Sequence, residues 1–96
     1  MAIYVSLVKF TDAGIKNIKD SPKRAQAFRA MAEKKGLKVR DIYWCVGRYD
    51  LITVTEGDDE AATAVLLTSN SLGNVRTETM RAMDQETFSR ILKNVG

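Results

Sequence analysis

Residues 2–10, AIYVSLVKF, form a mostly apolar run that predicts a β-strand, in which successive side chains point to opposite faces. One face of this strand carries Ile3, Val5 and Leu7. The other face carries Tyr4, Ser6, Val8 and Phe10. Because both faces are largely apolar, we expect this strand to be buried on both sides.

The same alternation returns over residues 37–46 and 51–56, and the tetrapeptide 47–50, GRYD, interrupts it. Two strand-like runs separated by a short glycine-containing segment predict a β-hairpin. In the first run, Trp44 shares its face with Ile42 and Val46, so we expect it in the core. Tyr43 and Cys45 point to the other face of that run. Residues 74–82 predict a fourth strand.

Apolar residues at helical spacing fill the gaps between these strands, beginning with a short turn predicted at residues 13–18. Ser21 and Pro22 then indicate a helix start with a hydroxyl cap, and Gly36 is a typical helix end. A second helix is predicted from Asp58 or Asp59 to Gly73. Its buried stripe consists of Ala61, Ala62, Val65, Leu66 and Leu72. A last helix, capped by Asp84, covers residues 85–94, with an apolar edge of Phe88, Ile91, Leu92 and Val95.

The order strand–helix–strand–strand–helix–strand, followed by a terminal helix, predicts one α+β domain of the ferredoxin-like βαββαβ kind over residues 1–96. Two helices cover only one face of a four-stranded antiparallel sheet. We expect the uncovered face to carry Tyr4, Ser6, Val8, Phe10, Tyr43 and Cys45. An exposed apolar patch of this size is typical of an interface, so the sequence predicts a homodimer or larger homo-oligomer with sheets packed face to face.

Composition and charge change this picture little. Apolar residues make up 45% and charged residues 28%, and no apolar run approaches the roughly 20 residues of a membrane-spanning helix. With no leader-like N-terminus and a single cysteine, we expect a cytoplasmic protein without a disulfide or a membrane partner. Residues 1–50 hold eleven Lys and Arg against five Asp and Glu, which attracts anions or nucleic acid unless it is only a solvated helix face.

Several kinds of chemistry are excluded by residues that the chain lacks. It has no histidine, which rules out Cys-His catalysis, Ser-His-Asp catalysis and a His-ligated metal site. Its six glycines are scattered singly, so no phosphate-binding loop is present. We therefore expect no metal, no cofactor and no catalytic residue. The enzymatic alternative is a cofactor-independent oxygenase or isomerase in a barrel pocket, with candidate bases Tyr4, Tyr43, Tyr49 and Asp50.

Three segments resemble the GYD-domain family: residues 10–25, FTDAGIKNIKDSPKRA; residues 43–51, YWCVGRYDL; and residues 71–82, SLGNVRTETMRA. The resemblance spans nearly the whole chain in order. It places the family signature on Gly47, Tyr49 and Asp50, with Thr11, Gly14, Pro22 and Arg24 before it and Gly73, Arg76, Thr77 and Thr79 after it. It implies a dimeric α/β-barrel fold and leaves the molecular function open.

The half from Val39 onward also looks like the effector-binding domain of leucine-responsive transcription regulators, in which a G-x-Y-D hairpin precedes a second helix and a last strand. This likeness implies a small molecule, often an amino acid, bound at a subunit interface. Because 96 residues leave no room for the helix-turn-helix of those regulators, we do not expect direct nucleic-acid binding.

The hairpin residues Tyr49 and Asp50 have two interpretations. As a turn, Gly47 adopts a positive φ and Asp50 accepts main-chain N–H bonds. As a site, the Tyr49 phenol and the Asp50 carboxylate face an interface pocket, where Asp50 binds a ligand amine. On the last predicted strand, Arg76 offers a planar fork to a carboxylate, unless it pairs with Glu78 or Asp50.

These candidates together predict a ligand-binding set at the barrel or subunit interface, made of Tyr43, Tyr49, Asp50, Arg76 and Thr77. The predicted function is a homodimeric small-ligand-binding or regulatory module. The cofactor-independent enzyme is the alternative.

Overall fold

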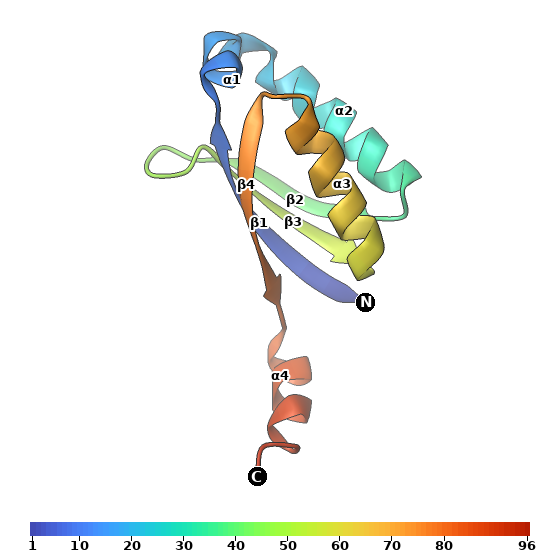
Figure 1. The fold of residues 1–96 in the computed structure, drawn as a ribbon. Coiled ribbons are helices and arrows are strands. Elements are labelled where there is room, and N and C mark those ends of the chain that lie inside the picture. Colours follow the sequence, from blue (N-terminus) through green and yellow to red (C-terminus); the bar gives the residue numbers. More distant parts are fainter.

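The computed structural model describes all 96 residues and has the α+β ferredoxin-like fold that the order of elements predicts. Its four strands are β1 (Ala2–Phe10), β2 (Lys38–Trp44), β3 (Leu51–Gly57) and β4 (Val75–Ala82). They form one antiparallel sheet in the order β2-β3-β1-β4. The helices α2 (Ser21–Lys34) and α3 (Asp59–Ser71) both lie on one face of this sheet (Figure 1).

Both long helices share a face because each connects two parallel strands that flank a third. The pairings make β2 parallel to β1, with β3 between them, and β4 parallel to β3, with β1 between them. Connections between parallel strands are almost always right-handed, which sends both helices to the same side. The opposite side of the sheet, called here the open face, is left without a helix (Figure 1).

The remaining elements are short or lie apart from the body. The helix α1 (Asp12–Lys16) and the 3₁₀ helix η1 (Ile18–Asp20) connect β1 to α2. The helix α4 (Gln85–Leu92) follows β4 and extends away from the sheet (Figure 1). The apolar edge predicted for this last helix is exposed at Phe88, Ile91 and Leu92. No helix is both long and apolar enough to cross a membrane.

Most of the predicted helix ends are confirmed. Asp58 and Asp84 accept main-chain N–H bonds at the starts of α3 and α4, and Gly36 and Gly73 adopt positive φ angles of 87° and 86°. The cap predicted at Ser21 is wrong. Ser21 is already helical, and its hydroxyl accepts a hydrogen bond from another element.

That other element is β2, whose Trp44 indole N–H donates to the Ser21 hydroxyl at 3.0 Å. Trp44 is 48% exposed, so the prediction that it lies in the core is wrong. It shares the helix-facing side with Ile42, as predicted, but sits at the end of the strand, beside the start of α2. The strand stops at Trp44, and Cys45 and Val46 already belong to the hairpin.

The two faces of β1 are opposite to our expectation. Tyr4, Ser6 and Val8 are buried under the helices, and the Tyr4 hydroxyl donates to the Asp59 carboxylate of α3. The open face carries the other set of β1, with Val5 opposite Val54 and Leu7 opposite Ile52. Alternation shows which side chains share a face, but not which face the helices cover.

The structure also places the three other residues that we expected on the uncovered face. Tyr43 lies on the open face, as predicted, and is 59% exposed. Phe10 lies on the helix side, and Cys45 lies in the hairpin and belongs to neither face. Leu72 does not belong to the buried stripe of α3, because the helix ends at Ser71 and Leu72 is exposed in the following turn.

Candidate functional site

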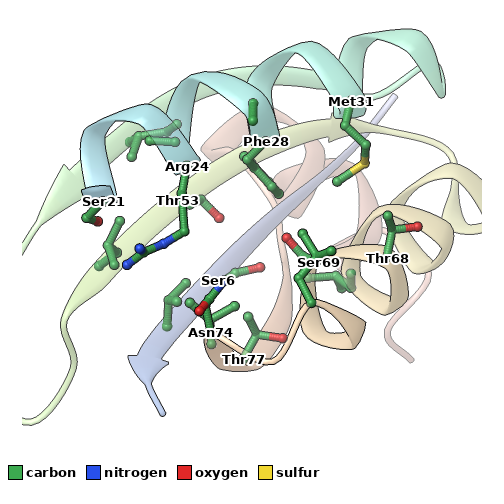
Figure 2. Close-up of a pocket in the computed structure, with 18 of the residues that line it drawn as sticks. Ser6, Ser21, Arg24, Phe28, Met31, Thr53, Thr68, Ser69, Asn74 and Thr77 are labelled. Carbon is green, nitrogen blue, oxygen red and sulfur yellow. The ribbon is translucent and has the colours of Figure 1, made fainter. Parts of the chain in front are cut away.

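A cavity of about 260 Å³ lies between α2, α3 and the helix-facing side of the sheet. Eleven of its nineteen lining residues are hydrophobic. Figure 2 shows Arg24, Phe28 and Met31 descending from α2 toward a floor that contains Ser6 and Thr53. Small-molecule sites are typically concave and mostly apolar, with a few polar groups, and this cavity has that composition.

The cavity exists because small side chains meet there. The sheet contributes the hydroxyl residues Ser6, Thr53 and Thr77 to its floor, and α2 contributes Ala25 and Ala27. These side chains do not span the gap between a helix and a sheet, which stack about 10 Å apart. Beyond the cavity, larger residues from the sheet, the helices and their connections close the core. They include Tyr4, Leu37 and Val65.

Several polar groups of the lining are already hydrogen-bonded within the chain. The Ser6 and Thr79 hydroxyls are 2.8 Å apart, and the Thr77 hydroxyl accepts a bond of 3.0 Å from the Asn70 side chain. No side-chain polar atom is both fully buried and without a partner. The Thr53 hydroxyl and the Asn74 side-chain amide line the cavity without such an internal bond, so they are available to a ligand.

Arg24 is the only ionisable side chain among the lining residues. Its guanidinium donates to the main-chain carbonyls of Asn17, at 2.9 Å, and Gly14, at 3.2 Å. No carboxylate pairs with it, since the two ion pairs of the chain join Arg40 to Glu56 and Arg90 to Glu86. Arg24 therefore places a fixed and unneutralised positive charge at the edge of an apolar space.

The hairpin residues have the structural role that one of our two interpretations gave them. Gly47 has a φ of 152°, and the Asp50 carboxylate accepts the main-chain N–H of Phe10 at 2.8 Å. The Tyr49 hydroxyl donates to Glu78 of β4 at 3.1 Å. Asp50 is thus a turn residue that holds the hairpin to the end of β1.

The five residues of the predicted ligand set do not converge within one subunit. Tyr43 and Arg76 belong to the open face, and Thr77 lines the cavity on the opposite side of the sheet. The predicted pairing of Arg76 with Glu78 or Asp50 is absent, because Arg76 makes no ion pair. A role of these residues in ligand binding stays a prediction for an assembled interface.

Sequence reasoning missed Arg24, Thr53 and Asn74 as cavity residues. A signal for Arg24 was present, because Arg24, Phe28 and Met31 follow one another at the spacing of a single helix face. Thr53 carried a weaker signal. It alternates with Ile52 and Val54, but nothing in the local pattern shows that its face lies under the helices.

Comparison with known proteins defines the family. The family model of the GYD domain matches residues 4–92, which is nearly the whole chain. The chain belongs to the GYD domain family. A curated relative of this GYD domain is the glutamine synthetase and cystathionine beta-lyase binding protein of Thermus thermophilus. The two are 31% identical over 85 residues, which are 86% of this chain and 90% of the relative.

Solved structures of low sequence identity share the fold. They include MtbAldR, at a TM-score of 0.67 and 15% identity, and a feast or famine regulatory protein from M. tuberculosis complexed with L-methionine, at 0.65 and 15%. This GYD domain aligns over 88% of its length with each, but spans only about half of those chains, 54% and 52%. FFRP-DM1 is matched over its full length at a TM-score of 0.58 and 22% identity, with 86% of this chain covered.

Proposed function

We propose that this GYD domain is a homodimeric binding module that holds a small ligand in the cavity between its helices and sheet. The observation that carries this proposal is the preformed and mostly apolar cavity of about 260 Å³. A dry cavity of about 150 Å³ already accepts benzene, so a ring with a short substituent has room here. A core that served only for stability would be filled, since protein interiors pack closely.

Binding without catalysis agrees with the chemistry of the lining. A general base must reach the proton that it removes, and the only ionisable group at the cavity is a guanidinium, which has no proton-accepting site. None of Tyr4, Tyr43, Tyr49 and Asp50, the bases considered for an enzyme, lines the cavity. These contacts favour the binding module over the enzymatic alternative.

The dimer is supported by the inverted polarity of the sheet. The open face carries the aliphatic side chains, whereas the helix side carries hydroxyl residues as well as apolar ones. On β1 and β3, the open-face set is Ile3, Val5, Leu7, Ile52 and Val54. The helix-side set is Tyr4, Ser6, Val8, Leu51, Thr53 and Thr55. An aliphatic centre of this kind is typical of an interface, and we propose that a second copy covers it.

The charges around the open face are complementary to a second copy. Lys9 of β1 lies opposite Arg76 of β4 near one end of the sheet, and Glu56 of β3 lies opposite Ile3 near the other end. When two such faces meet with their β1 strands antiparallel, the basic end of each lies across from Glu56 of the other, a carboxylate that Arg40 of its own chain already contacts at 3.5 Å. Complementary charges of this kind set the register of an interface.

The area that a stable dimer interface needs gives the exposed edge of α4 a role in the proposed dimer. From strand spacings of about 4.8 Å and rises of about 3.3 Å per residue, four strands of about seven residues present a flat area of about 440 Å². A standard interface buries about 800 Å² on each partner, so the sheet alone falls short. In our proposal, the exposed edge of α4, with Phe88 and Ile91, supplies further area against the second copy.

The relatives support a binding role. The Thermus protein is named for binding two enzymes, and one structural neighbour was solved with L-methionine. We propose that this GYD domain also binds a partner protein, and that a ligand in the cavity regulates this binding. In the dimer, Tyr43 and Arg76 of the predicted ligand set lie at the subunit interface.

A thermal-shift screen with amino acids and small aromatic metabolites tests the cavity. A ligand at about 100 times its Kd stabilises a protein by about 2.7 kcal/mol, which raises the Tm of a domain of this size by about 10 °C or more. We expect Ala25→Phe, which fills the cavity, to abolish the shift.

The matched control is Ala30→Phe, an exposed position on the same helix, which should keep the shift. Equal shifts in both variants would locate the ligand outside the cavity and contradict the proposal. So would the absence of any shift from the whole set in the wild-type protein.

A further inference from the structure

We infer that the cavity selects a small organic anion, namely a monocarboxylate with an apolar or aromatic body, and that Arg24 binds its charged group. This inference rests on the proposed function, because it names the ligand class of the same cavity. It differs from the interface set predicted from the sequence, since the site lies inside one subunit, on the helix side of the sheet.

The charge of Arg24 has no partner in the chain. Arg24 is half-buried and lines an apolar cavity, and its guanidinium has no carboxylate within ion-pair distance. Placing a charge against apolar surface without a counter-charge is unfavourable. A ligand anion supplies the missing charge, and a single cation in the lining fits a single negative charge on the ligand.

The donors of Arg24 fit a carboxylate. A guanidinium has five N–H donors in a planar fork, and the carbonyls of Asn17 and Gly14 use two of them. The remaining donors suffice for two hydrogen bonds to one carboxylate, the arrangement that Arg favours. The two carbonyl bonds also hold the side chain in place, so less conformational entropy is lost when a ligand binds.

The rest of the lining gives the shape of the ligand. Figure 2 shows Arg24 beside Ser21 at one end of the cavity, with Phe28 and Met31 farther along α2. An acid held at Arg24 therefore extends its body between Phe28, Met31 and the sheet. The Thr53 hydroxyl and the Asn74 amide can accept or donate one further hydrogen bond from the floor. Polyphosphates are disfavoured because no second cation lines the space.

The test compares phenylacetate with its neutral analogue phenylacetamide by isothermal titration calorimetry on the intact protein. The two probes have the same ring and nearly the same size, so the difference reports the exchange of a charged carboxylate for a neutral amide. We expect the wild-type protein to bind the acid at least about tenfold more tightly, as hydrogen bonds to charged groups do. Arg24→Gln should bring the two affinities within about twofold.

The matched control is Arg29→Gln on the same helix, because Arg29 donates to the Val39 carbonyl and does not line the cavity. It should keep the preference for the acid. Arg24→Lys, which keeps the charge but not the fork, should retain part of it, and circular dichroism checks that each variant is folded.

Two results overturn the inference in different ways. Equal affinities for acid and amide in the wild-type protein would show that the cavity does not select an anion, while leaving it as a ligand site. A preference that persists in Arg24→Gln would assign the anion to another group. If neither probe binds, and the thermal-shift screen also gives no shift that Ala25→Phe removes and Ala30→Phe keeps, the proposed function itself is wrong.

Discussion

At the end of β1, the Asp50 carboxylate accepts the main-chain N–H of Phe10 at 2.8 Å. Asp50→Ala leaves this N–H without its acceptor, so we expect the free energy of unfolding to fall by about 1–3 kcal/mol without any ligand. Urea denaturation measures the change. Glu33→Ala, at an exposed position of α2, should stay within about 0.5 kcal/mol of the wild type. An unchanged Asp50→Ala variant would favour the ligand interpretation of this carboxylate.

Gly14 shows how closely α1 packs on the start of β4. A Cβ added to it would overlap the carbonyl of Asn74, the same carbonyl that accepts the main-chain N–H of Thr11. Because the obstacle is main chain, it cannot rotate away, and we expect Gly14→Ala to destabilise the fold by about 1–3 kcal/mol.

Thermal unfolding followed by circular dichroism measures the effect of Gly14→Ala. The control is Gly96→Ala, where an added Cβ meets nothing within 4 Å. Equal Tm values for the two variants would mean that α1 does not dock against Asn74 as described.

Among the elements, α4 depends most on the cap at its N-terminus, because its apolar edge is exposed in the single chain. Hydrogen bonds from Thr87, led by its main-chain N–H, hold the pKa of Asp84 below the usual aspartate value. A lowered pKa means that the carboxylate stabilises the helix at pH values above the ordinary aspartate pKa of about 3.9. This contribution is lost as the pH falls through the pKa of the folded state.

We therefore expect α4 to fray in acid before the sheet unfolds. The amide chemical shift of Thr87, followed by NMR from pH 7 to pH 2, reports the loss of the cap. Asp84→Asn is the matched control, because asparagine also caps helices but does not titrate. Its Thr87 shift should stay constant over this range, and a titration that persists would identify another group as the cause.

At the scale of the whole molecule, the aliphatic open face predicts a dimer. Val54 lies near the centre of that face, opposite Val5 of β1. Val54→Lys places a charge where the second copy would pack, so we expect it to convert the dimer to a monomer. Light scattering after size exclusion measures this as a fall toward the chain mass of 10.7 kDa.

The control for the dimer is Thr63→Lys, an exposed position on α3 away from the open face. It should keep the mass of two chains. A wild-type protein that stays monomeric at every concentration would disprove the dimer, but the cavity lies within one subunit and would remain a candidate site.

The elements could be predicted from the sequence because their signals are local. The glycines at 36 and 73 and the aspartates at 58 and 84 act on the main chain within a few residues, so a short stretch defines each helix end. The order of the elements then limits the fold to a small set of topologies. Arg24 could also have been placed beside Phe28 by helical spacing.

The sequence by itself determined the strands, the helices, their order and, within a single strand, which side chains share a face. Only the tertiary structure decided that Tyr4, Ser6 and Val8 face the helices and that Trp44 meets Ser21 at the edge. The reason is that alternation has the same period on both sides of a strand, whereas the side that is covered depends on the path of the connecting helices. A cavity is likewise space left between elements, and no single segment encodes it.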